Sequence, residues 1–291
     1  MSASRARLAD GRVHLQHGPI DLVIGVDGPP AARDDAIERA WRRFEPLLAE
    51  LVAELARLRR CAEPHDRPDG AVARRMHGAV LPFRPRFVTP MAAVAGAVAD
   101  TLAGVIADPH LERCFVNNGG DIALWLSPGA RPYRIGVALE RGGVLGRAGL
   151  GAALPATLCV EPDSPWRGLA TSGWRGRSLS LGIADSVTVL ATDGARADAA
   201  ATMIANAVDV DHPAIVRAPA ASLRDDSDLG DRLATVDVPP LTDAAVRRAL
   251  DAGEAEARCC LDRGLVGAAL IALQGRWRVV GALAPRLANA A

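Results

Sequence analysis

The spacing of hydrophobic residues changes several times along the chain, and each change predicts a different element. Residues 12–27 alternate between apolar and polar positions and turn at Gly18-Pro19, which predicts two β-strands joined by a tight connection. From Asp34 to Arg60 apolar residues recur every three or four positions, which predicts an amphipathic helix. Pro46 interrupts this pattern and either kinks one helix or opens a second.

The next stretch of the pattern is irregular and then becomes strongly helical. Residues 62–88 contain prolines and a glycine and predict a long connection with a short strand near Gly78 to Phe83. Thr89 as N-cap and Pro90 at the first helical position then predict a helix rich in alanine and glycine. Because one face of this helix is thin, another backbone or a ligand can approach it closely.

The remaining pattern alternates short strands with two helices. It predicts strands in CFV, IALWL, RPYRIGVAL, 156–160 and SVTVLA, a glycine-rich loop at 141–155, and a helix in ARADAAATMIANAV. Residues 212–240 are polar and predict mostly loop, followed by a helix over 242–263 with Thr242 as cap and a hairpin turning at Gln274-Gly275. Hairpins at both ends favour an α+β fold, with a mixed, largely antiparallel sheet and packed helices.

Length and composition limit the class of protein. The 291 residues are compatible with a single domain over 1–291 or with two intimately packed lobes. Acidic and basic residues balance at 34 each, which argues against nucleic acid or anionic membrane as partners. No apolar run is long enough to span a bilayer, the N-terminus lacks the apolar segment of a secretory signal, and a cytoplasmic protein is expected.

Several kinds of chemistry find no support in the sequence. The chain contains no lysine, which excludes Schiff-base chemistry, and its five cysteines lack the spacing of a zinc site or a disulfide framework. Neither GxGxxG nor a Walker loop is present, and no internal repeat is visible. A small-molecule ligand is the expected partner, and base rates of assembly favour a homodimer.

Five residues between two predicted strands form the first candidate site: Asn117, Asn118, Gly119, Gly120 and Asp121. Asn118-Gly119 is a favoured type I′ turn signal, so a plain hairpin accounts for the segment. Alternatively, the two glycines expose backbone N–H groups to a ligand, with Asn117 and Asp121 as acceptors on either side. Local sequence leaves both interpretations open.

Two further segments carry candidate chemistry. Thr171, Ser172 and Gly173 are either a strand-ending turn or a hydroxyl pair suited to phosphate oxygens. Asp198 and Thr202 are four positions apart on a predicted helix, so they share a face and offer hard oxygen donors that suit Mg²⁺. Alternatively, Asp198 is an acid in the first helical turn and Thr202 bonds back to the preceding turn.

The order of these motifs resembles that of one family. VNNGGDIAL, RPYRIGV, LATSG, SVTV and ADAAAT follow one another as the corresponding motifs do in the ApbE-like flavin-transferase superfamily, and the resemblance covers roughly Thr89 to Val208. TPMAAVAGAVAD and LGIADSVTVLA are most similar to the short, uncharacterised side branch of that superfamily.

The resemblance implies an α+β fold in which these loops line one ligand cleft, so segments around positions 120, 172 and 200 are expected to converge. In well-studied members the ligand is FAD, the metal is Mg²⁺, and an FMN moiety passes to a threonine of another protein. By the same resemblance, Asp198 and Thr202 match the metal-binding pair. Other positions match the loops that line the flavin site, namely Asn117, Gly119, Gly120, Asp121, Thr171, Ser172 and Gly173.

One interval departs from the family pattern. The transferases have a histidine-containing segment ending in Asp-Pro between the TSG loop and the SVTV strand, whereas this chain has WRGRSLSLGIAD. Asp185 ends that interval and is a candidate catalytic carboxylate. The sequence therefore predicts an enzyme that binds a flavin, a nucleotide or another phosphate-bearing ligand with Mg²⁺. An Mg²⁺-dependent FMN transferase that uses FAD and a non-catalytic flavin or metabolite carrier or sensor are the alternatives.

Overall fold

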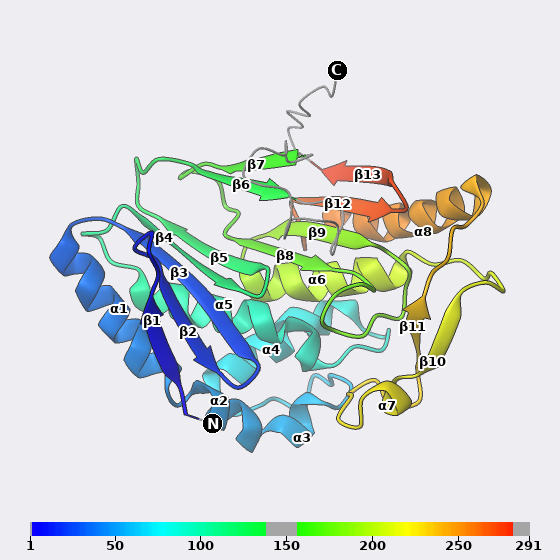
Figure 1. The fold of residues 1–291 in the computed structure, drawn as a ribbon, viewed down its shortest axis with the longest axis horizontal. Coiled ribbons are helices and arrows are strands. Elements are labelled where there is room, and N and C mark those ends of the chain that lie inside the picture. The colour runs from blue at the N-terminus through cyan, green and yellow to red at the C-terminus, as the bar shows by residue number, and fades with distance from the viewer. Residues whose placement is uncertain (1, 138–155, 282–291) are drawn as a thin grey trace. The chain divides into compact units, whose positions relative to one another are not determined.

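The computed structural model of the protein describes residues 2–137 and 156–281, and within them it confirms the expected α+β class. Strands and helices alternate irregularly along the chain (Figure 1). The strand pairs whose residue-by-residue pairing is established are all antiparallel. The predicted glycine-rich loop at 141–155 lies outside the described residues.

The chain forms two compact units, which are described separately. Unit 1 comprises Met1–Pro132, Val160–Ala170 and Leu190–Ala199, and unit 2 comprises Tyr133–Cys159, Thr171–Val189 and Ala200–Ala291. Four elements contribute residues to both units, namely β7 (Ala156–Val160), β8 (Gly168–Ser172), β9 (Ser186–Ala191) and α6 (Gly194–Ala207).

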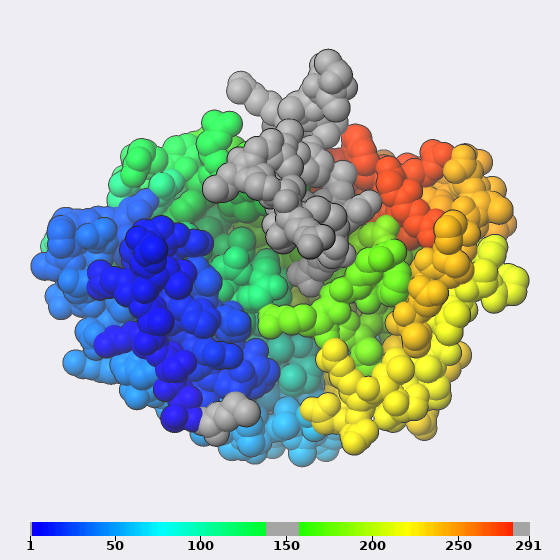
Figure 2. Space-filling model, in the orientation of Figure 1, coloured from blue at the N-terminus to red at the C-terminus, as the bar shows by residue number. Residues whose placement is uncertain are grey.

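In unit 1 the strands are hydrogen-bonded in the order β1-β2-β3-β4-β5-β8-β9. Their bounds are β1 Ser4–Arg7, β2 Val13–His17, β3 Ile20–Asp27, β4 Arg113–Asn118 and β5 Asp121–Leu126. β3 and β4 alternate between buried and half-buried positions, so one face of each strand enters the core. β1 was not predicted, and all four of its residues are exposed, as Figure 2 shows for the blue N-terminal strand.

The helices of unit 1 pack around α5 (Val94–Ile106). α5 lies against β4 and β5 and also contacts α1 and α4. The other helical elements are α1 Pro30–Phe44, α2 Leu47–Ala53, α3 Leu55–Leu58, α4 Ala71–Val80, η1 Leu81–Phe83 and η2 Pro90–Ala93. Leu102 and Ile106 of α5 are fully buried together with Leu22 and Ile24 of β3, because the apolar sides of helix and strand face the same core.

Three helical predictions need correction. The helix expected from Asp34 to Arg60 is divided into α1, α2 and α3. Of the two alternatives at Pro46, the opening of a second helix is confirmed, with Pro46 as the N-cap of α2. Thr89 precedes the 3-10 turn η2 and makes no side-chain cap hydrogen bond, so the α-helix itself begins later, at Val94. The strand expected near Gly78 to Phe83 is wrong, since α4 and η1 occupy that region.

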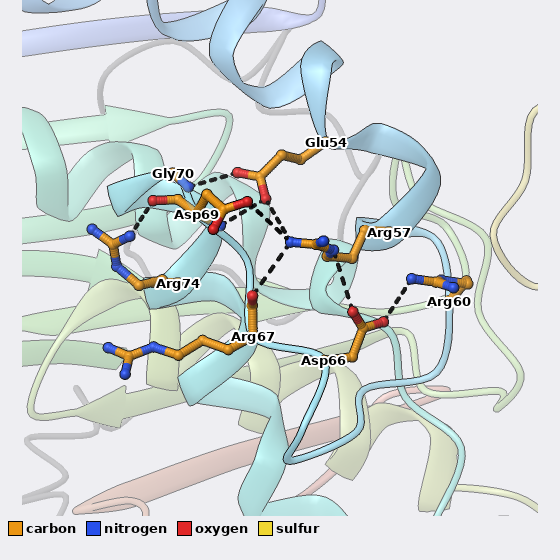
Figure 3. A network of polar contacts seen from close by, with 8 residues as sticks. All are labelled: Glu54, Arg57, Arg60, Asp66, Arg67, Asp69, Gly70 and Arg74. Carbon is orange, nitrogen blue, oxygen red and sulfur yellow. Dashed lines mark hydrogen bonds and ion pairs between the residues drawn. The ribbon is translucent and has the colours of Figure 1, made fainter.

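The loop before α4 is held by the carboxylate of Glu54, which lies between α2 and α3, a contact that local sequence does not reveal. Glu54 accepts hydrogen bonds from the N–H groups of Asp69 and Gly70, at 2.8 and 2.6 Å, where Gly70 is the N-cap of α4. Arg57 points to the same carboxylate and to Asp66, as Figure 3 shows. Glu54 therefore satisfies backbone donors at the start of α4 that the helix itself leaves without a partner.

Unit 2 contains the hydrogen-bonded order β8-β9-β12-β13, with β12 Ala268–Leu273 and β13 Arg276–Gly281. Helix α8 (Asp243–Asp262) packs on β12 and β13, and Thr242 caps it by accepting from the Ala245 N–H, as predicted. Both β9 and β12 are buried along their whole length. The sequence of β12 is accordingly apolar throughout, whereas β9 also buries Ser186 and Thr188. The remaining elements are β6 Tyr133–Val137, β7 Ala156–Val160, β10 Val216–Pro219, α7 Ala220–Leu223 and β11 Leu233–Asp237.

Candidate functional site

The glycine pair of unit 1 forms the turn between β4 and β5. Gly119 and Gly120 occupy its two central positions with φ of 65° and 118°, and Asn118 pairs with Asp121 across the hairpin. Positive φ at both central residues is what a type I′ turn requires. The turn is therefore centred one residue later than the predicted Asn118-Gly119 dipeptide. The physical reason is that Asn118 stays in the strand, on the same buried face as Cys114 and Val116.

The two asparagines of this loop have different partners. Asn117 closes the turn, since its Oδ1 accepts from the Gly120 N–H at 2.8 Å. Asn118 is only 5% exposed, and its Nδ2 donates to the backbone carbonyl of Ala95 at 3.2 Å. Gly119 is exposed and Asp121 is half-buried. The segment is thus a turn in the structure, and its contact with a ligand stays a prediction.

Asp198 contacts the start of helix α5, next to the residue that Asn118 contacts. Its Oδ2 accepts from the Gly96 N–H at 3.1 Å, and Gly96 follows the residue that Asn118 contacts. Helix α6 has no acidic residue in its first turn, so the alternative in which Asp198 serves the start of its own helix is wrong. Asp198 and Thr202 are both half-buried on α6.

Asp100 was missed in the sequence, and its buried carboxylate has a raised pKa. Its carboxylate accepts from the N–H groups of Gly194 and Ala195, at 2.7 and 2.9 Å, and so caps α6 from the neighbouring helix α5. Burial, together with the negative charge of Asp193, raises the pKa of Asp100 to about 6. The two amide hydrogen bonds and Arg75, whose Nη1 lies 3.7 Å from Oδ2, oppose that shift.

Glycines allow the contact between the starts of α5 and α6. A Cβ on Gly96 would lie 2.1 Å from the Gly194 carbonyl oxygen, and one on Gly168 would lie 2.0 Å from the Asp193 carbonyl oxygen. Of the two uses expected for the thin helix, the structure shows close approach to another backbone. The sequence signal for Asp100 was a single acid four positions after Gly96 in an otherwise apolar helix.

In unit 2 the TSG segment ends a strand rather than forming a loop. Thr171 and Ser172 belong to β8, and Thr171 Oγ1 lies 2.9 Å from Thr188 Oγ1 of β9. Gly173 follows with φ of 157°, and a Cβ there would lie 2.4 Å from the Asp185 carbonyl oxygen. Gly173 and Asp185 are therefore in backbone contact, as the two motifs would need to be in a common site.

The side chain of Asp185 is occupied by its own surroundings. It is 5% exposed, and Trp174 Nε1 and Arg175 Nε each donate to Oδ1 at 3.3 Å. Oδ2 accepts from the Gln274 N–H at 2.5 Å. Gln274, with φ of 45°, begins the predicted hairpin turn between β12 and β13. Asp185 thus joins the start of β9 to that turn, a structural role that the sequence did not suggest.

The structure brings together two subsets of the predicted residues. In unit 1 Asn118 and Asp198 contact the Ala95-Gly96 segment of α5. In unit 2 Gly173 contacts Asp185. Among the described residues, no group of three or more His, Cys, Asp or Glu side chains is arranged to hold a metal ion.

Comparisons with known proteins bear on the same segments. The model of the family described as AbpE bacteria matches residues 5–279. A UPF0280 protein of Methanosphaerula palustris is 37% identical over 148 residues, which are 50% of this chain and 56% of that relative, so the chain spans little more than half of that relative. A UPF0280 protein of Methanosarcina acetivorans is 30% identical over 206 residues, covering 69% of this chain and 74% of the relative.

Among solved structures, the apo form of the flavinyl transferase ApbE of Pseudomonas stutzeri aligns with a TM-score of 0.40 at 14% identity, over 96% of this chain and 93% of that one. The family assignment rests on the sequence matches. Since the family model matches nearly the whole described chain, and the Methanosarcina acetivorans relative is covered over most of its length, the chain belongs to the bacterial AbpE family, within the ApbE-like superfamily that its motifs resemble.

Proposed function

We propose that this protein binds a flavin or another phosphate-bearing ligand together with Mg²⁺ at helix α6, and that it is an enzyme. The observation that carries the proposal is the placement of Asp198. Its carboxylate is held by the Gly96 amide of α5, and Thr202 lies one turn further along the same helix. Both side chains are half-buried and so have access to solvent, and the Gly96 amide holds the Asp198 carboxylate in place.

The donor set fits Mg²⁺ better than a softer metal. A carboxylate and a hydroxyl are hard oxygen donors, and Mg²⁺ characteristically uses one or two carboxylates and completes its shell with waters and substrate phosphates. The described residues contain no cluster of three acidic, histidine or cysteine side chains, which a metal held by protein ligands alone would require. Bound there, Mg²⁺ would offset the negative charge of ligand phosphates next to Asp198 and Thr202.

FMN transfer to another protein is the second candidate, and the position of Asp185 argues against it. Asp185 ends the interval that lacks the histidine segment of the transferases, and Trp174, Arg175 and the Gln274 amide all donate to its carboxylate. A carboxylate that already holds three donors is poorly placed to move a proton in a transfer reaction. The absence of the histidine segment from this interval supports the third candidate, a non-catalytic flavin or metabolite carrier.

Titration with FAD, with and without Mg²⁺, tests the proposal. We expect the purified protein to bind FAD more tightly when Mg²⁺ is present, as followed by flavin fluorescence. Asp198→Asn should remove the Mg²⁺-dependent part and weaken binding by at least about tenfold. Asp251→Asn, which makes the same charge change at an exposed position of α8, is the matched control.

The products distinguish the candidates. Release of AMP with FMN left on a protein would support the transferase, whereas FAD that is bound and recovered intact would favour the carrier or a different reaction. Equal Mg²⁺ dependence in the parent and in Asp198→Asn would contradict the metal site.

Among the described residues no helix is long and apolar enough to cross a membrane. A cytoplasmic location and a homodimer stay predictions, and light scattering of the purified protein tests the second.

A further inference from the structure

Helices α5 and α6 contain nearly the same short sequence in their N-terminal halves, a repeat that was not predicted from the sequence. Residues 96–100 read GAVAD and residues 194–198 read GARAD. In each copy the glycine is followed four positions later by the aspartate, so glycine and aspartate lie on one face of the helix. Both copies belong to unit 1.

The two copies cap each other. Asp100 accepts from the first amides of α6, at Gly194 and Ala195, while Asp198 accepts from the Gly96 amide in the first turn of α5. Early helical amides have no partner within their own helix, so each aspartate satisfies donors of the opposite helix. Gly96 and Gly194 lie between them in backbone contact.

The copies differ in how they are surrounded. Asp100 is 9% exposed and accepts from two amides, whereas Asp198 is half-buried and accepts from the Gly96 amide. The Gly96 amide belongs to the same peptide group as the Ala95 carbonyl, and that carbonyl accepts from Asn118 Nδ2 at 3.2 Å. Because a peptide group is planar, the bond from Asn118 to its carbonyl also fixes the direction of its N–H.

We propose that Asn118 is a positioning residue for the metal-binding carboxylate of Asp198 and acts through the Ala95-Gly96 peptide. The inference rests on the proposed function, since it assigns Asp198 to a metal. Asn118 comes from β4 and is 5% exposed, so it is held by the core rather than by solvent. A donor on the carbonyl side polarises the peptide and strengthens the charge-assisted bond on the amide side. The result is a carboxylate whose orientation is set before a cation arrives.

Two measurements on the full chain test this inference. The first is the amide resonance of Gly96 by NMR, which should move to lower proton frequency in Asn118→Ala and in Asp198→Asn, because both weaken the same hydrogen bond. The second is the affinity for Mn²⁺, used as a paramagnetic substitute for Mg²⁺ and followed by water-proton relaxation. Asn118→Ala should lower the Mn²⁺ affinity by about threefold to tenfold. This loss is at or below the loss usually seen when a group that orients a metal ligand is removed.

The controls separate positioning from loss of stability. Thr235→Val removes a buried side-chain bond to a backbone carbonyl in unit 2, at 2.9 Å, and should leave Mn²⁺ affinity unchanged. Asn118→Leu, which keeps the branched shape of the side chain at a somewhat larger volume and removes the donor, replaces Asn118→Ala if that variant does not fold.

Each result has a distinct meaning. Parental Mn²⁺ affinity and an unmoved Gly96 resonance in the Asn118 variants would overturn the inference alone, provided that Asp198→Asn abolishes binding. Parental affinity in Asp198→Asn, or no Mn²⁺ binding by the parent, would overturn the proposed function and the inference together.

Discussion

Asp100 places a carboxylate where the surrounding helix supplies almost no polar groups. It lies on the α5 face that contains Gly96, and it satisfies two amides of α6. Those bonds favour the ionised form, but burial and the charge of Asp193 outweigh them and raise the pKa to about 6. At neutral pH the ionised carboxylate thus caps the helix at the expense of its own desolvation.

This raised pKa predicts the direction of a pH effect on stability. An unfolded aspartate releases its proton near pH 3.8, whereas folded Asp100 keeps it to about pH 6, so the folded state binds more protons between these values. The free energy of unfolding contributed by this group therefore falls as the pH rises through that window, by up to about 3 kcal/mol, and is constant above it.

Urea unfolding at several pH values between about 3 and 7, roughly one unit on either side of the window, checks this expectation. Asp100→Asn cannot titrate, so the difference in unfolding free energy between parent and variant should change across the window and stay level above about pH 7. A difference that stays level throughout would show that the Asp100 pKa is not raised.

Individual residues also show where sequence reasoning stops. The motif order located Asp198, Thr202 and the glycine turn, because each carries a local signal. The contacts of the Ala95-Gly96 peptide join residues 23 positions apart, to Asn118, and 102 positions apart, to Asp198. No periodicity or turn signal encodes such pairs. Asp185 was noticed as a carboxylate, but its hydrogen bond to the Gln274 amide depends on how β9 and β12 align.

Helix α5 depends on Gly96 for its contact with α6. A Cβ at this position would meet the Gly194 carbonyl oxygen at 2.1 Å, and that neighbour is backbone, which cannot turn aside. Gly96→Ala should therefore lower the free energy of unfolding by about 3 kcal/mol or more, as overpacking in a close backbone contact does. Urea unfolding at neutral pH measures the change.

Gly104 in the same helix is the matched control. It is exposed, and nothing lies within 4 Å of a Cβ built there. Gly104→Ala should raise the free energy of unfolding by about 0.5–1 kcal/mol, because alanine loses less backbone entropy than glycine on entering a helix. Similar effects of the two substitutions would contradict the assignment of Gly96 to a close contact.

Helix α4 starts where Glu54 of the preceding helical segment reaches its N-terminal amides. The Glu54 side chain is 15% exposed and accepts from Asp69 and Gly70 while Arg57 lies 3.3 Å away (Figure 3). Glu54→Gln removes the charge and one acceptor, and we expect it to cost about 1–2 kcal/mol of unfolding free energy.

Glu50→Gln is the control for Glu54→Gln. It shows whether neutralising another glutamate in this region lowers the unfolding free energy by the same amount. Glu50 pairs with Arg43, but its side chain is 41% exposed, so this substitution should cost at most about 1 kcal/mol. Thermal unfolding of both variants provides the comparison. An equal loss would mean that Glu54 acts as an ordinary surface ion pair rather than as the cap of α4.

The chain as a whole was most predictable where a segment carries its own pattern. The hairpin β2-β3, the hairpin β12-β13 and the capped helix α8 follow directly from alternation, turn residues and a threonine cap. α4 was misread as a connection because its short apolar face follows a polar, proline-containing loop that Glu54 fixes from a distance. Exposed β1 has no apolar alternation, and it joins the sheet by pairing with β2.

Cooperativity of unfolding follows from the elements that the two units share. β8, β9 and α6 each contribute residues to both, and the division of α6 falls between Ala199 and Ala200, inside a continuous helix. Unfolding one unit alone would have to break this helix in its middle, where hydrogen bonds on both sides depend on the same run of backbone. We therefore expect both units to lose structure in one transition.

Hydrogen exchange at increasing urea, read on peptides from α1 in unit 1 and α8 in unit 2, should give a common midpoint. Separate midpoints, with protection of α6 lost along with the weaker unit, would show instead that the shared elements do not couple the two.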